Sequence, residues 1–418
     1  MKDNIIAGLD IGSNTIRLVI GQFLSDREAS EGLQIIGAVD APSDGISKGA
    51  VKSIDDTTSA ISACLEKAER LVGVPINKVW VSINCPYIKC ERSRGVVAVG
   101  KSDGEITEDD VARAVEAAQA MSVPPNYEIL HVLPVKFTVD NQEDIKDPLG
   151  MIGVRLEVET LVIQGLSSHI KNLTKAVYRT GLEIEDLVLS PLVAAEAVIS
   201  PKQKELGAAL INIGSATTSL AVFEEGELLH TAILPIGSEH ITSDIAIGLR
   251  IPINLAEKIK LELGNAEPEK FGKKDMVNIS DLIEEEGAEG TAPEVPIKYL
   301  AEIIEARVEE IFEKVDNELK KIERSVMLPA GAFLTGGGAK LTGLVEVAKK
   351  KLRLPACLGT NKSLSSIIDK VNDPSFLPAL GLVIWGSQKG DTGRKWPGGA
   401  AVDNLIEKAK RLFSSLMP

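Results

Sequence analysis

The sequence predicts an α/β protein of two similar lobes, with a smaller α+β subdomain inserted into the first lobe. Three observations predict this architecture. The chain has 418 residues, which is too long for one ordinary hydrophobic core. Two glycine hairpins with the same layout occupy residues 5–23 and 207–224. Between them, the segment 84–162 has the strand, helix, strand, strand pattern of a compact insert.

Composition and charge limit the classes of function. Hydrophobic residues make up 44% of the chain and charged residues 25%, a balance typical of globular proteins. The net charge of -14 argues against a nucleic acid partner, because contacts to a phosphate backbone need a basic surface. Residues 386–418 nevertheless contain six Lys and Arg against three Asp and Glu, which indicates an anionic target for this segment. No run of about 18 uncharged apolar residues occurs, so we expect any membrane contact to be peripheral.

The two hairpins share one layout. The first reads IIAGLDIGSNTIRLVIGQF, with Asp10 at the end of its first strand and Gly12-Ser13-Asn14 in the turn. The second reads GAALINIGSATTSLAVFE, with Asn212 ending the strand and Gly214-Ser215-Ala216 before Thr217. One such hairpin would be an ordinary tight turn. Two copies indicate a duplicated domain with two facing halves.

Hairpins of this kind can hold phosphate groups. Gly12 and Gly214 let the backbone turn tightly, so that consecutive N–H groups point into a gap and form an anion-binding nest. Further donors are the hydroxyls of Ser13, Ser215 and Thr217. Two opposed nests would hold a polyphosphate from both sides. Asp10 would then hold Mg²⁺ through water, since Mg²⁺ keeps several waters and takes one or two carboxylates.

A third glycine element reads GAFLTGGGAKLTGL over residues 331–344. A strand ends at Thr335, Gly336-Gly337-Gly338 and Lys340 follow, and we expect a helix to begin near Leu341 or Thr342. A strand, a glycine turn and a helix N-terminus together favour a nucleotide, and the glycines leave room for a flat base or ribose. The alternative is a plain connection between a strand and a helix.

The order DIGSNT, INIGSATT and LTGGGAKL resembles the phosphate 1, phosphate 2 and adenosine motifs of the actin/Hsp70/sugar-kinase superfamily. This resemblance covers residues 5 to about 386. It implies an α/β actin-like two-lobe ATPase fold of duplicated RNase H-like domains, with ATP and Mg²⁺ as ligands. It also implies that Glu257 and Lys260 bracket the adenosine. Residues 190–198 and 376–386 resemble the two connecting helices, where Ala379 and Gly381 would permit close helix contact.

The inserted segment resembles one branch of this superfamily. Residues 131–159 are closely similar to the inserted subdomain of the bacterial division family FtsA, and DPLGMIGVRLE (147–157) is their most specific motif. We therefore expect six regions: core lobe 1A (1–83 and 163–195), inserted subdomain 1C (84–162), core lobe 2A (196–240 and 326–385), subdomain 2B (241–325), a flexible linker (386–399) and an amphipathic membrane-targeting helix (400–418).

The tail has the pattern of an interfacial helix. Residues 386–399 are glycine-rich and lack apolar periodicity, and at 100° per residue the apolar side chains that follow fall within an arc of about 120°. Basic residues lie on the polar side, as in helices that rest on anionic headgroups. The residues expected to bind a membrane are Leu405, Ile406, Lys408, Lys410, Arg411, Leu412, Phe413 and Leu416. The alternative is a helix docked on the protein's own core or on a partner.

Resemblance to the FtsA family implies the biological role. The chain would polymerise, tether the tubulin-like protein FtsZ to the inner face of the cytoplasmic membrane at the division site, and recruit later division proteins through its inserted subdomain. The C-terminal peptide of FtsZ would dock on subdomain 2B, which contains a predicted helix at 298–324. We expect the acid-rich stretch 281–286 to be a solvated loop and not a docking site.

One position departs from the superfamily pattern, because most members place Asp where this chain has Asn212. A neutral amide holds Mg²⁺ less well and cannot act as a base. We therefore expect ATP binding with slow turnover or none. No arrangement that would activate an attacking water is evident. Glu196 is the catalytic candidate, with helix packing near the hinge as its alternative role.

Three other functions remain open. DIGSNTIRLVI resembles the first motif of exopolyphosphatases, so a polyphosphate phosphatase or a sugar kinase of the same superfamily is one alternative. An actin-like scaffold of type IV pilus assembly shares the fold but would not be expected to carry this linker and tail. A chaperone-type ATPase would need a peptide-binding domain, for which the predicted regions leave no room.

Overall fold

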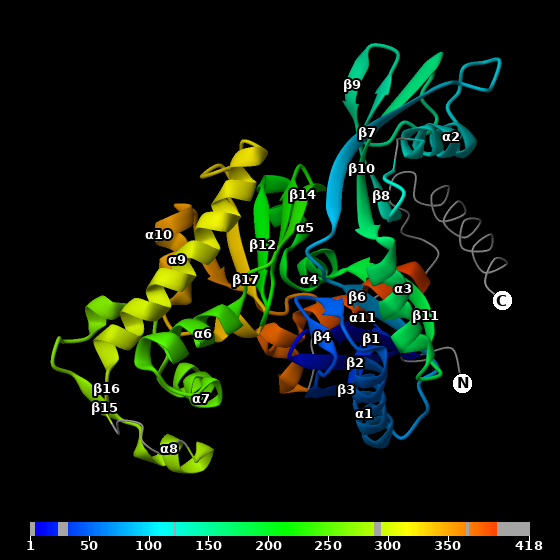
Figure 1. Ribbon diagram of the computed structural model, residues 1–418. Coiled ribbons are helices and arrows are strands. Elements are labelled where there is room, and N and C mark those ends of the chain that lie inside the picture. Colours follow the sequence, from blue (N-terminus) through cyan, green and yellow to red (C-terminus); the bar gives the residue numbers. More distant parts are fainter. Residues whose placement is uncertain (1–4, 24–31, 121–122, 288–293, 365–367, 391–418) are drawn as a thin grey trace. The chain divides into compact units, whose positions relative to one another are not determined.

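The computed structural model describes residues 5–23, 32–120, 123–287, 294–364 and 368–390. These residues form two compact units (Figure 1). The first unit comprises the residues up to 86 together with 172–226 and 230–387, and the second is built on residues 87–171. None of the described helices combines the length and the apolar character needed to cross a bilayer.

The first sheet of the larger unit has the strand order β11-β6-β1-β2-β3. Its strands are β1 (Ile5–Ile11), β2 (Thr15–Phe23), β3 (Leu33–Pro42), β6 (Lys78–Ile83) and β11 (Glu183–Leu189). β1, β2 and β3 pair antiparallel, whereas β6 runs parallel to β1 and β11 runs parallel to β6. The two-residue strands β4 (Ile46–Ser47) and β5 (Ala50–Val51) form a separate hairpin.

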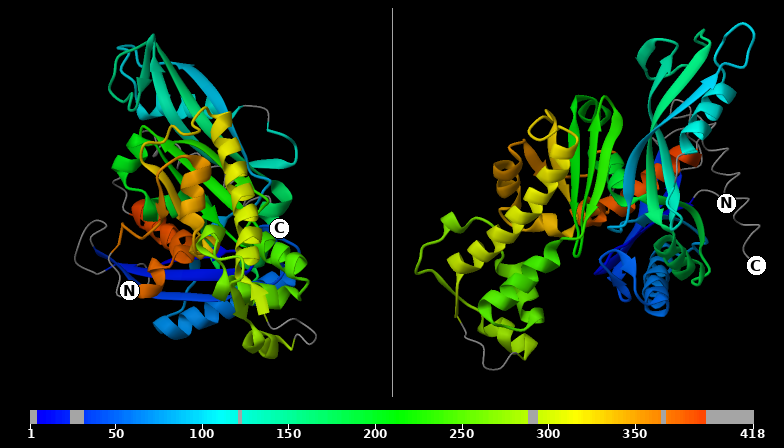
Figure 2. Two further views of the ribbon diagram at one scale, coloured as in Figure 1. Left: turned by 90° about the vertical axis from the view of Figure 1, so that its left-hand side faces the viewer. Right: turned by 45° about the horizontal axis from the view of Figure 1, so that its top comes forward.

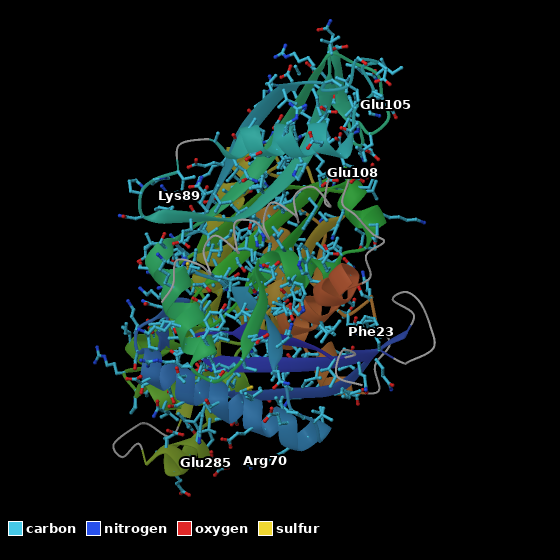
Figure 3. The ribbon with its side chains drawn as sticks, turned by 90° about the vertical axis from the view of Figure 1, so that its right-hand side faces the viewer. Phe23, Arg70, Lys89, Glu105, Glu108 and Glu285 are labelled. Atoms are coloured by element: carbon cyan, nitrogen blue, oxygen red, sulfur yellow. The ribbon has the colours of Figure 1, made fainter. Side chains whose placement is uncertain are left out.

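Helix α1 (Ile54–Val72) packs along β2 and β3, as Figure 3 shows with Arg70 in its last turn. Ser53 caps its N-terminus by accepting a hydrogen bond from the Asp56 amide, and Gly73 ends it in the left-handed region at φ 74°. The helix therefore begins and ends where capping residues stand in the sequence.

The second sheet of the larger unit repeats the topology of the first. Its strand order is β14-β13-β12-β17-β18. This matches the first sheet read from its other edge, β3-β2-β1-β6-β11, so that β12 takes the place of β1. The strands are β12 (Ala208–Ile213), β13 (Thr218–Glu224), β14 (Glu227–Leu234), β17 (Gly331–Thr335) and β18 (Ala356–Leu358). β17 runs parallel to β12 and β18 parallel to β17, as β6 and β11 do in the first sheet. The repeated order shows the duplication that the two hairpins predicted.

Two helices connect these sheets. Helix α4 (Ser190–Val198) coincides with the predicted segment and touches strands of both sheets. Helix α11 (Leu377–Gly390) crosses α4 at Gly381, where the backbones approach so closely that no side chain fits between them. The sequence predicted a linker from residue 386, but α11 continues to Gly390, with Ser387 buried. The remaining predicted linker and the tail helix lie outside the described residues.

A helical region follows β14. It contains α6 (Ser238–Leu249), α7 (Ile253–Leu263), α8 (Ser280–Glu286), α9 (Ile297–Lys321) and the short strands β15 (Met276–Asn278) and β16 (Glu294–Pro296). α9 packs against α6 and against α10 (Leu344–Leu352), as Figures 1 and 2 show. The expectation of a solvated loop at 281–286 is wrong, because this stretch forms α8. Lys258 of α7 pairs with Glu285 and Glu286, and Leu282 is buried.

The smaller unit is a four-stranded sheet with one helix. The sheet has the order β7-β10-β8-β9, from β7 (Lys89–Ala98), β8 (Tyr127–Val139), β9 (Gln142–Ile145) and β10 (Arg155–Leu166). Helix α2 (Glu108–Gln119) covers one face over a core that includes Val115, Phe137 and Val158. The predicted strand, helix, strand, strand order holds except for β9, a fourth strand that the sequence analysis missed. β10 leads into α3 (Ser167–Tyr178).

The remaining elements are short. α5 (Pro201–Leu206) precedes β12, and four described 3₁₀ turns are η2 (Pro268–Lys270), η3 (Gly337–Lys340), η4 (Asp369–Asn372) and η5 (Pro374–Phe376). Of these, η3 and η5 matter for the site, because both adjoin the glycine turn after β17.

Candidate functional site

A cavity of about 400 Å³ opens within the larger unit, between the two hairpin turns and the glycine turn. It is lined by all fourteen residues that the sequence predicted for ligand and metal binding: Asp10, Gly12, Ser13, Asn14, Gly214, Ser215, Ala216, Thr217, Glu257, Lys260, Gly336, Gly337, Gly338 and Lys340. The two facing hairpins and the third glycine element therefore meet at one place, although they are far apart in the sequence. Glu196 is not among the lining residues.

The two hairpin turns have the same geometry. In the first, the Gly12 amide donates to the Thr15 carbonyl at 3.2 Å, and in the second the Gly214 amide donates to Thr217 at 2.8 Å. Neither glycine has a positive φ, so the tight turn does not need glycine for a left-handed backbone conformation. Glycine is needed for space instead: a Cβ at Gly12 or Gly214 would lie within 3.0 Å of the carbonyl oxygen that its own amide contacts.

The turns leave backbone donors available. The amides of Ser13, Asn14, Ser215 and Ala216 have no hydrogen-bond acceptor in the part of the chain that the structure describes. Unpaired amides are costly when buried, and a row of them at a turn is an anion-binding nest. The start of α6 adds rigidity to the second turn, because the amides of Ser238 and Glu239 donate to Gly214 and Ser215 at 2.9 and 2.8 Å.

The three hydroxyls predicted as donors differ in what they can still do. Ser13 Oγ accepts from the Gly49 amide at 3.0 Å, and Thr217 Oγ1 accepts from Asn84 Nδ2 at 3.2 Å, so both keep a proton to donate. Ser215 Oγ instead donates to Glu239 Oε2 at 3.1 Å. The expectation that Ser215 supplies a free donor therefore does not fit the geometry, because its proton is already used.

The glycine turn needs each glycine for a different reason. Gly336 has φ 86°, and a side chain there would strike Asn212 and Ile213. A side chain at Gly338 would strike Ile213. At Gly337 nothing lies within 4 Å of a Cβ position, so the open space at this residue belongs to the cavity. The helix was predicted to begin at 341 or 342. In the structure the last two glycines already belong to the 3₁₀ turn η3, and α10 begins only at Leu344.

Glu257 and Lys260 form one network on α7. Lys260 is only 8% exposed, and its Nζ donates to Glu257 Oε2 at 2.6 Å and to Thr242 Oγ1 at 2.8 Å. Thr242 of α6 also donates to Glu257. The ammonium is thus held at the cavity wall by partners from two helices. Lys260 Nζ also contacts the Ser238 carbonyl at 3.4 Å, so the buried ammonium has three acceptors, while the Glu257 side chain stays 41% exposed.

Asp10, near the end of β1, is a cavity-lining carboxylate two residues before Gly12. It is 8% exposed, accepts a hydrogen bond from Ser82, and lies opposite Arg17 in the hairpin. Burial raises the pKa of the Asp10 carboxyl, while the Ser82 hydroxyl and the Arg17 charge act in the opposite direction. A buried carboxylate beside a phosphate nest fits Mg²⁺, which takes one carboxylate together with phosphates and waters. In the described residues, no group of three His, Cys, Asp or Glu side chains lies close enough to bind a metal by itself.

The catalytic candidate Glu196 is engaged elsewhere. Its Oε1 pairs with Lys204 Nζ at 2.6 Å, and both side chains are largely buried. The described carboxylates that line the cavity are those of Asp10 and Glu257, and each already accepts hydrogen bonds from the protein. Ser190, the first residue of α4, also lines the cavity but carries no charge.

Several lining residues escaped the sequence analysis. They are Arg17, Asn84, Ser190, Leu261 and Thr342, among others. Asn84 follows β6 and reaches Thr217 of the other hairpin, so its role depends on a partner 133 positions away. Leu261 lines the cavity and is 72% exposed. For Arg17 a signal was available, because it stands directly opposite Asp10 in the predicted hairpin.

Two family models match the chain. The SHS2 domain inserted in FtsA matches residues 86–164, and the cell division protein FtsA matches residues 209–381. The chain is 38% identical over 382 residues to the cell division protein FtsA of Bacillus subtilis, covering 91% of this chain and 83% of that protein. It is 35% identical over 391 residues to the cell division protein FtsA of Pseudomonas aeruginosa, covering 93% and 91%.

Solved structures with low identity share the fold. The PilM–PilN type IV pilus biogenesis complex aligns with a TM-score of 0.62 at 16% identity, over 91% of this chain and 98% of that chain. MreB5 of Spiroplasma citri bound to ADP aligns with a TM-score of 0.55 at 12% identity, over 94% and 100%. A MamK double helical filament aligns with a TM-score of 0.51 at 10% identity, over 92% and 99%. These likenesses confirm the predicted α/β, two-lobe actin-like architecture.

Proposed function

The chain belongs to the FtsA family of cell division proteins, and from that premise we propose that it is an ATP-binding scaffold that links FtsZ to the membrane at the division site. The observation that carries the proposal is the single cavity where both hairpin turns and the glycine turn meet. Family membership favours this function over a pilus scaffold, a polyphosphate phosphatase or a chaperone-type ATPase.

ATP with Mg²⁺ is the ligand that fits the cavity best. Two rows of free amides face a polyphosphate, Asp10 supplies the carboxylate for Mg²⁺, and Gly337 leaves open space for the nucleoside. A relative in fold, MreB5 of Spiroplasma citri, has been solved bound to ADP. When bound, Mg²⁺ would neutralise part of the phosphate charge, while the hairpin amides orient the phosphates.

Gly337 provides a direct test of the site. Because nothing lies within 4 Å of its Cβ position, Gly337→Val should leave the thermal unfolding of the ligand-free protein unchanged while it fills the cavity. We expect ATP affinity to fall at least about tenfold, which corresponds to about 1.4 kcal/mol. Gly337→Ala, with a smaller side chain, is the matched control and should weaken binding less. Equal ATP affinity in the wild type and Gly337→Val would exclude this cavity as the nucleotide site.

We expect hydrolysis to be slow or absent. An in-line attack needs a group that orients or deprotonates a water. Asn212 is neutral, Ser190 is uncharged, and Glu257 is bound to Lys260 and Thr242. The cavity thus offers many hydrogen-bond donors to phosphate groups. Each of its described carboxylates already accepts hydrogen bonds from the protein, so neither is free to act as a base. Phosphate release from ATP, measured over hours with the purified chain, tests this expectation, and release of phosphate from polyphosphate would instead support the phosphatase alternative.

The helical region around α6, α7 and α9 is the proposed docking site for the C-terminal peptide of FtsZ. Besides Leu261, which lines the cavity, three large apolar side chains on these helices are exposed: Ile247 at 76%, Ile253 at 51% and Tyr299 at 46%. Arg250 is also exposed and makes no ion pair in the described residues. Gly248, the residue after Ile247, lets α6 approach Tyr299 and Ile303 of α9. Exposed apolar residues grouped in this way are typical of partner sites.

A single charge should disrupt this surface. We expect Ile247→Glu to weaken the binding of an FtsZ C-terminal peptide at least about tenfold, because it places a carboxylate among apolar contacts. Leu206→Glu is the matched control, since Leu206 is 61% exposed on α5 and outside the helical region. Similar peptide affinities for both variants would show that the peptide docks elsewhere.

Membrane attachment through the tail rests on the sequence pattern of residues 400–418, which lie outside the described residues. The test compares the full chain with a chain that ends at Gly390, so that α11 remains whole. Only the full chain should co-sediment with vesicles that contain anionic lipid, and Phe413→Glu in the full chain should reduce binding. Equal binding by the full and shortened chains would rule out the tail as the anchor.

Polymerisation is the last part of the proposal. One structure with this fold is a double helical filament of MamK, and a polymer would combine many weakly bound tails on one membrane. We expect the full chain to form filaments on anionic vesicles in the presence of ATP, visible by electron microscopy. Dispersed single molecules at saturating ATP and lipid would contradict this expectation.

A further inference from the structure

The cationic side chains that line the cavity are not equally available. Among the described lining residues they are Arg17, Lys260 and Lys340. Lys260 pairs with Glu257 at 2.6 Å, and Lys340 pairs with Asp373 at 2.8 Å. Arg17 forms no ion pair with any residue that the structure describes. It is therefore the cation of the described lining that an anionic ligand can engage without breaking an ion pair.

The hairpin register directs Arg17 toward the phosphate end of the cavity. Arg17 on β2 stands directly opposite Asp10 on β1, and directly opposite Asp40 on β3. Side chains of directly opposed residues on antiparallel strands lie on the same face of the sheet. Arg17 thus shares a face with Asp10, beside the turn formed by Gly12, Ser13 and Asn14.

The surroundings of Arg17 contact its guanidinium but do not provide hydrogen-bond acceptors for all of its donors. The guanidinium carbon lies 5.5 Å from the centre of the Phe376 ring, which is buried next to the lining residue Ser375. The nearby carboxylates have other partners: Asp10 accepts from Ser82, and Asp40 pairs with Lys370. Arg17 Nε is buried without a hydrogen-bond acceptor in the described residues. A buried donor left unpaired is destabilising, and more so when the group is charged.

We propose that Arg17 is a phosphate-binding residue of this site, and that its guanidinium donates hydrogen bonds to the phosphate tail of the bound nucleotide alongside the hairpin amides. The inference rests on the proposed binding of ATP. A guanidinium has five donors in a rigid fork that matches phosphate oxygens, and the Phe376 ring provides a cation–π contact for it in the absence of ligand. The orphaned Nε then has an acceptor in the occupied site.

A purely structural role for Arg17 makes a different prediction. In that case the side chain would only cover Phe376 and offset the charges of Asp10 and Asp40, and its loss would affect every ligand through the stability of the fold. A phosphate-binding role affects only ligands that carry phosphates. The ratio of ATP affinity to adenosine affinity in the same variant separates the two roles.

The experiment measures the dissociation constants of ATP and adenosine for the full chain and three variants. Arg17→Gln should weaken ATP binding about 10- to 100-fold, the range for a lost hydrogen bond to a charged group, and should leave adenosine affinity within about twofold. Arg17→Lys keeps the charge but not the forked donors, so its ATP affinity should lie between those of the wild type and Arg17→Gln. Lys67→Gln is the control, since Lys67 contacts the Asp40 carbonyl at 2.9 Å from an exposed position outside the cavity. It should leave both affinities within about twofold.

Two outcomes overturn the inference: an unchanged ATP affinity in Arg17→Gln, or an equal loss for ATP and adenosine. If Arg17→Gln does not fold, as thermal unfolding without ligand would show, the same ratio in Arg17→Lys decides. If the wild type binds adenosine and ATP equally well, the phosphates make no contribution to affinity. The inference then fails, and so does the proposal that the two hairpin turns bind the phosphates. If the wild type binds neither, the proposed function itself is wrong.

Discussion

The close crossing of α4 and α11 at Gly381 predicts a large effect for the smallest possible substitution, Gly381→Ala. The added Cβ would lie 1.8 Å from the Val193 carbonyl oxygen and 3.1 Å from the Ala194 amide nitrogen. Ordinary van der Waals contact begins near 3.4 Å, so the two helix backbones must separate by about 1.6 Å at the crossing. Because the obstacle is backbone, no change of side-chain rotamer relieves it.

The free energy of unfolding should therefore fall. Overpacking a tight contact costs about 1–3 kcal/mol and occasionally more, and a clash with backbone belongs at the upper end. Alanine gains about 1 kcal/mol over glycine from helix propensity, which leaves a net loss of about 2 kcal/mol. The assay is urea unfolding of the full chain, followed by circular dichroism. A loss of this size should lower the midpoint without changing the slope.

Gly248→Ala is the matched control for Gly381→Ala. Gly248 also lies in a helix, α6, but the nearest atom to its Cβ position is the terminal carbon of the Ile303 side chain, which can move. We expect little change in stability or a small gain from helix propensity. If both variants unfold at the same urea concentration, the α4–α11 crossing is not the rigid contact that the distances indicate.

Three further predictions concern single side chains. Burial acts to raise the pKa of the Asp110 carboxyl, but the hydrogen bonds from Thr107, Gly100 and Arg113 together outweigh it and lower the pKa to about 2. Asp110→Asn should therefore destabilise the smaller unit by about 2 kcal/mol at pH 7. In the wild type this contribution is present above about pH 4 and is lost as the pH falls toward 2, where urea unfolding should no longer distinguish the variant. Asn212→Asp places a carboxylate at a position that is 6% exposed, so it should lower the melting temperature of the ligand-free chain, and Mg²⁺ with ATP should restore it. Thr242→Val removes the hydroxyl between Lys260 and Glu257 and should weaken ATP binding about three- to tenfold in a titration, since one hydrogen bond contributes about 1 kcal/mol.

The hairpins and the glycine turn could be predicted from the sequence because each combines a strand pattern with glycines at fixed offsets. The connecting helix at 190–198 was found through its resemblance to a known family, and the structure has the same bounds. Features without a periodic signal were missed. β9 has only four residues, three of them exposed and polar. The acid-rich stretch of α8 gives no sign of a helix in the sequence, because Lys258, which forms ion pairs with its glutamates, is brought near only by the fold.

The functional roles of individual side chains were harder to predict than the elements that carry them. Ser215 was expected to donate a hydrogen bond to a ligand. In the structure, its hydroxyl instead donates to Glu239 of α6. Asn84 was not singled out, because what distinguishes it is a partner on another element. The hairpin pattern places Arg17 opposite Asp10, but the missing acceptor of its Nε is evident only in the fold. Such properties depend on which residues the fold brings together, and local patterns do not contain that information.

Helix α6 joins the two proposed binding sites, and this predicts that they are coupled. At its N-terminus, the amides of Ser238 and Glu239 hold the second hairpin turn, and one turn later Thr242 holds Lys260. At its other end, Ile247 is exposed and Gly248 packs against α9. A helix of 12 residues is about 18 Å long and transmits a displacement as a rigid rod. Saturating ATP should then change the affinity for the FtsZ peptide, and by linkage the peptide must change ATP affinity by the same factor. Titrations in both directions measure that factor. If each ligand binds equally well with and without the other, α6 does not connect the sites, even if both sites are correctly placed.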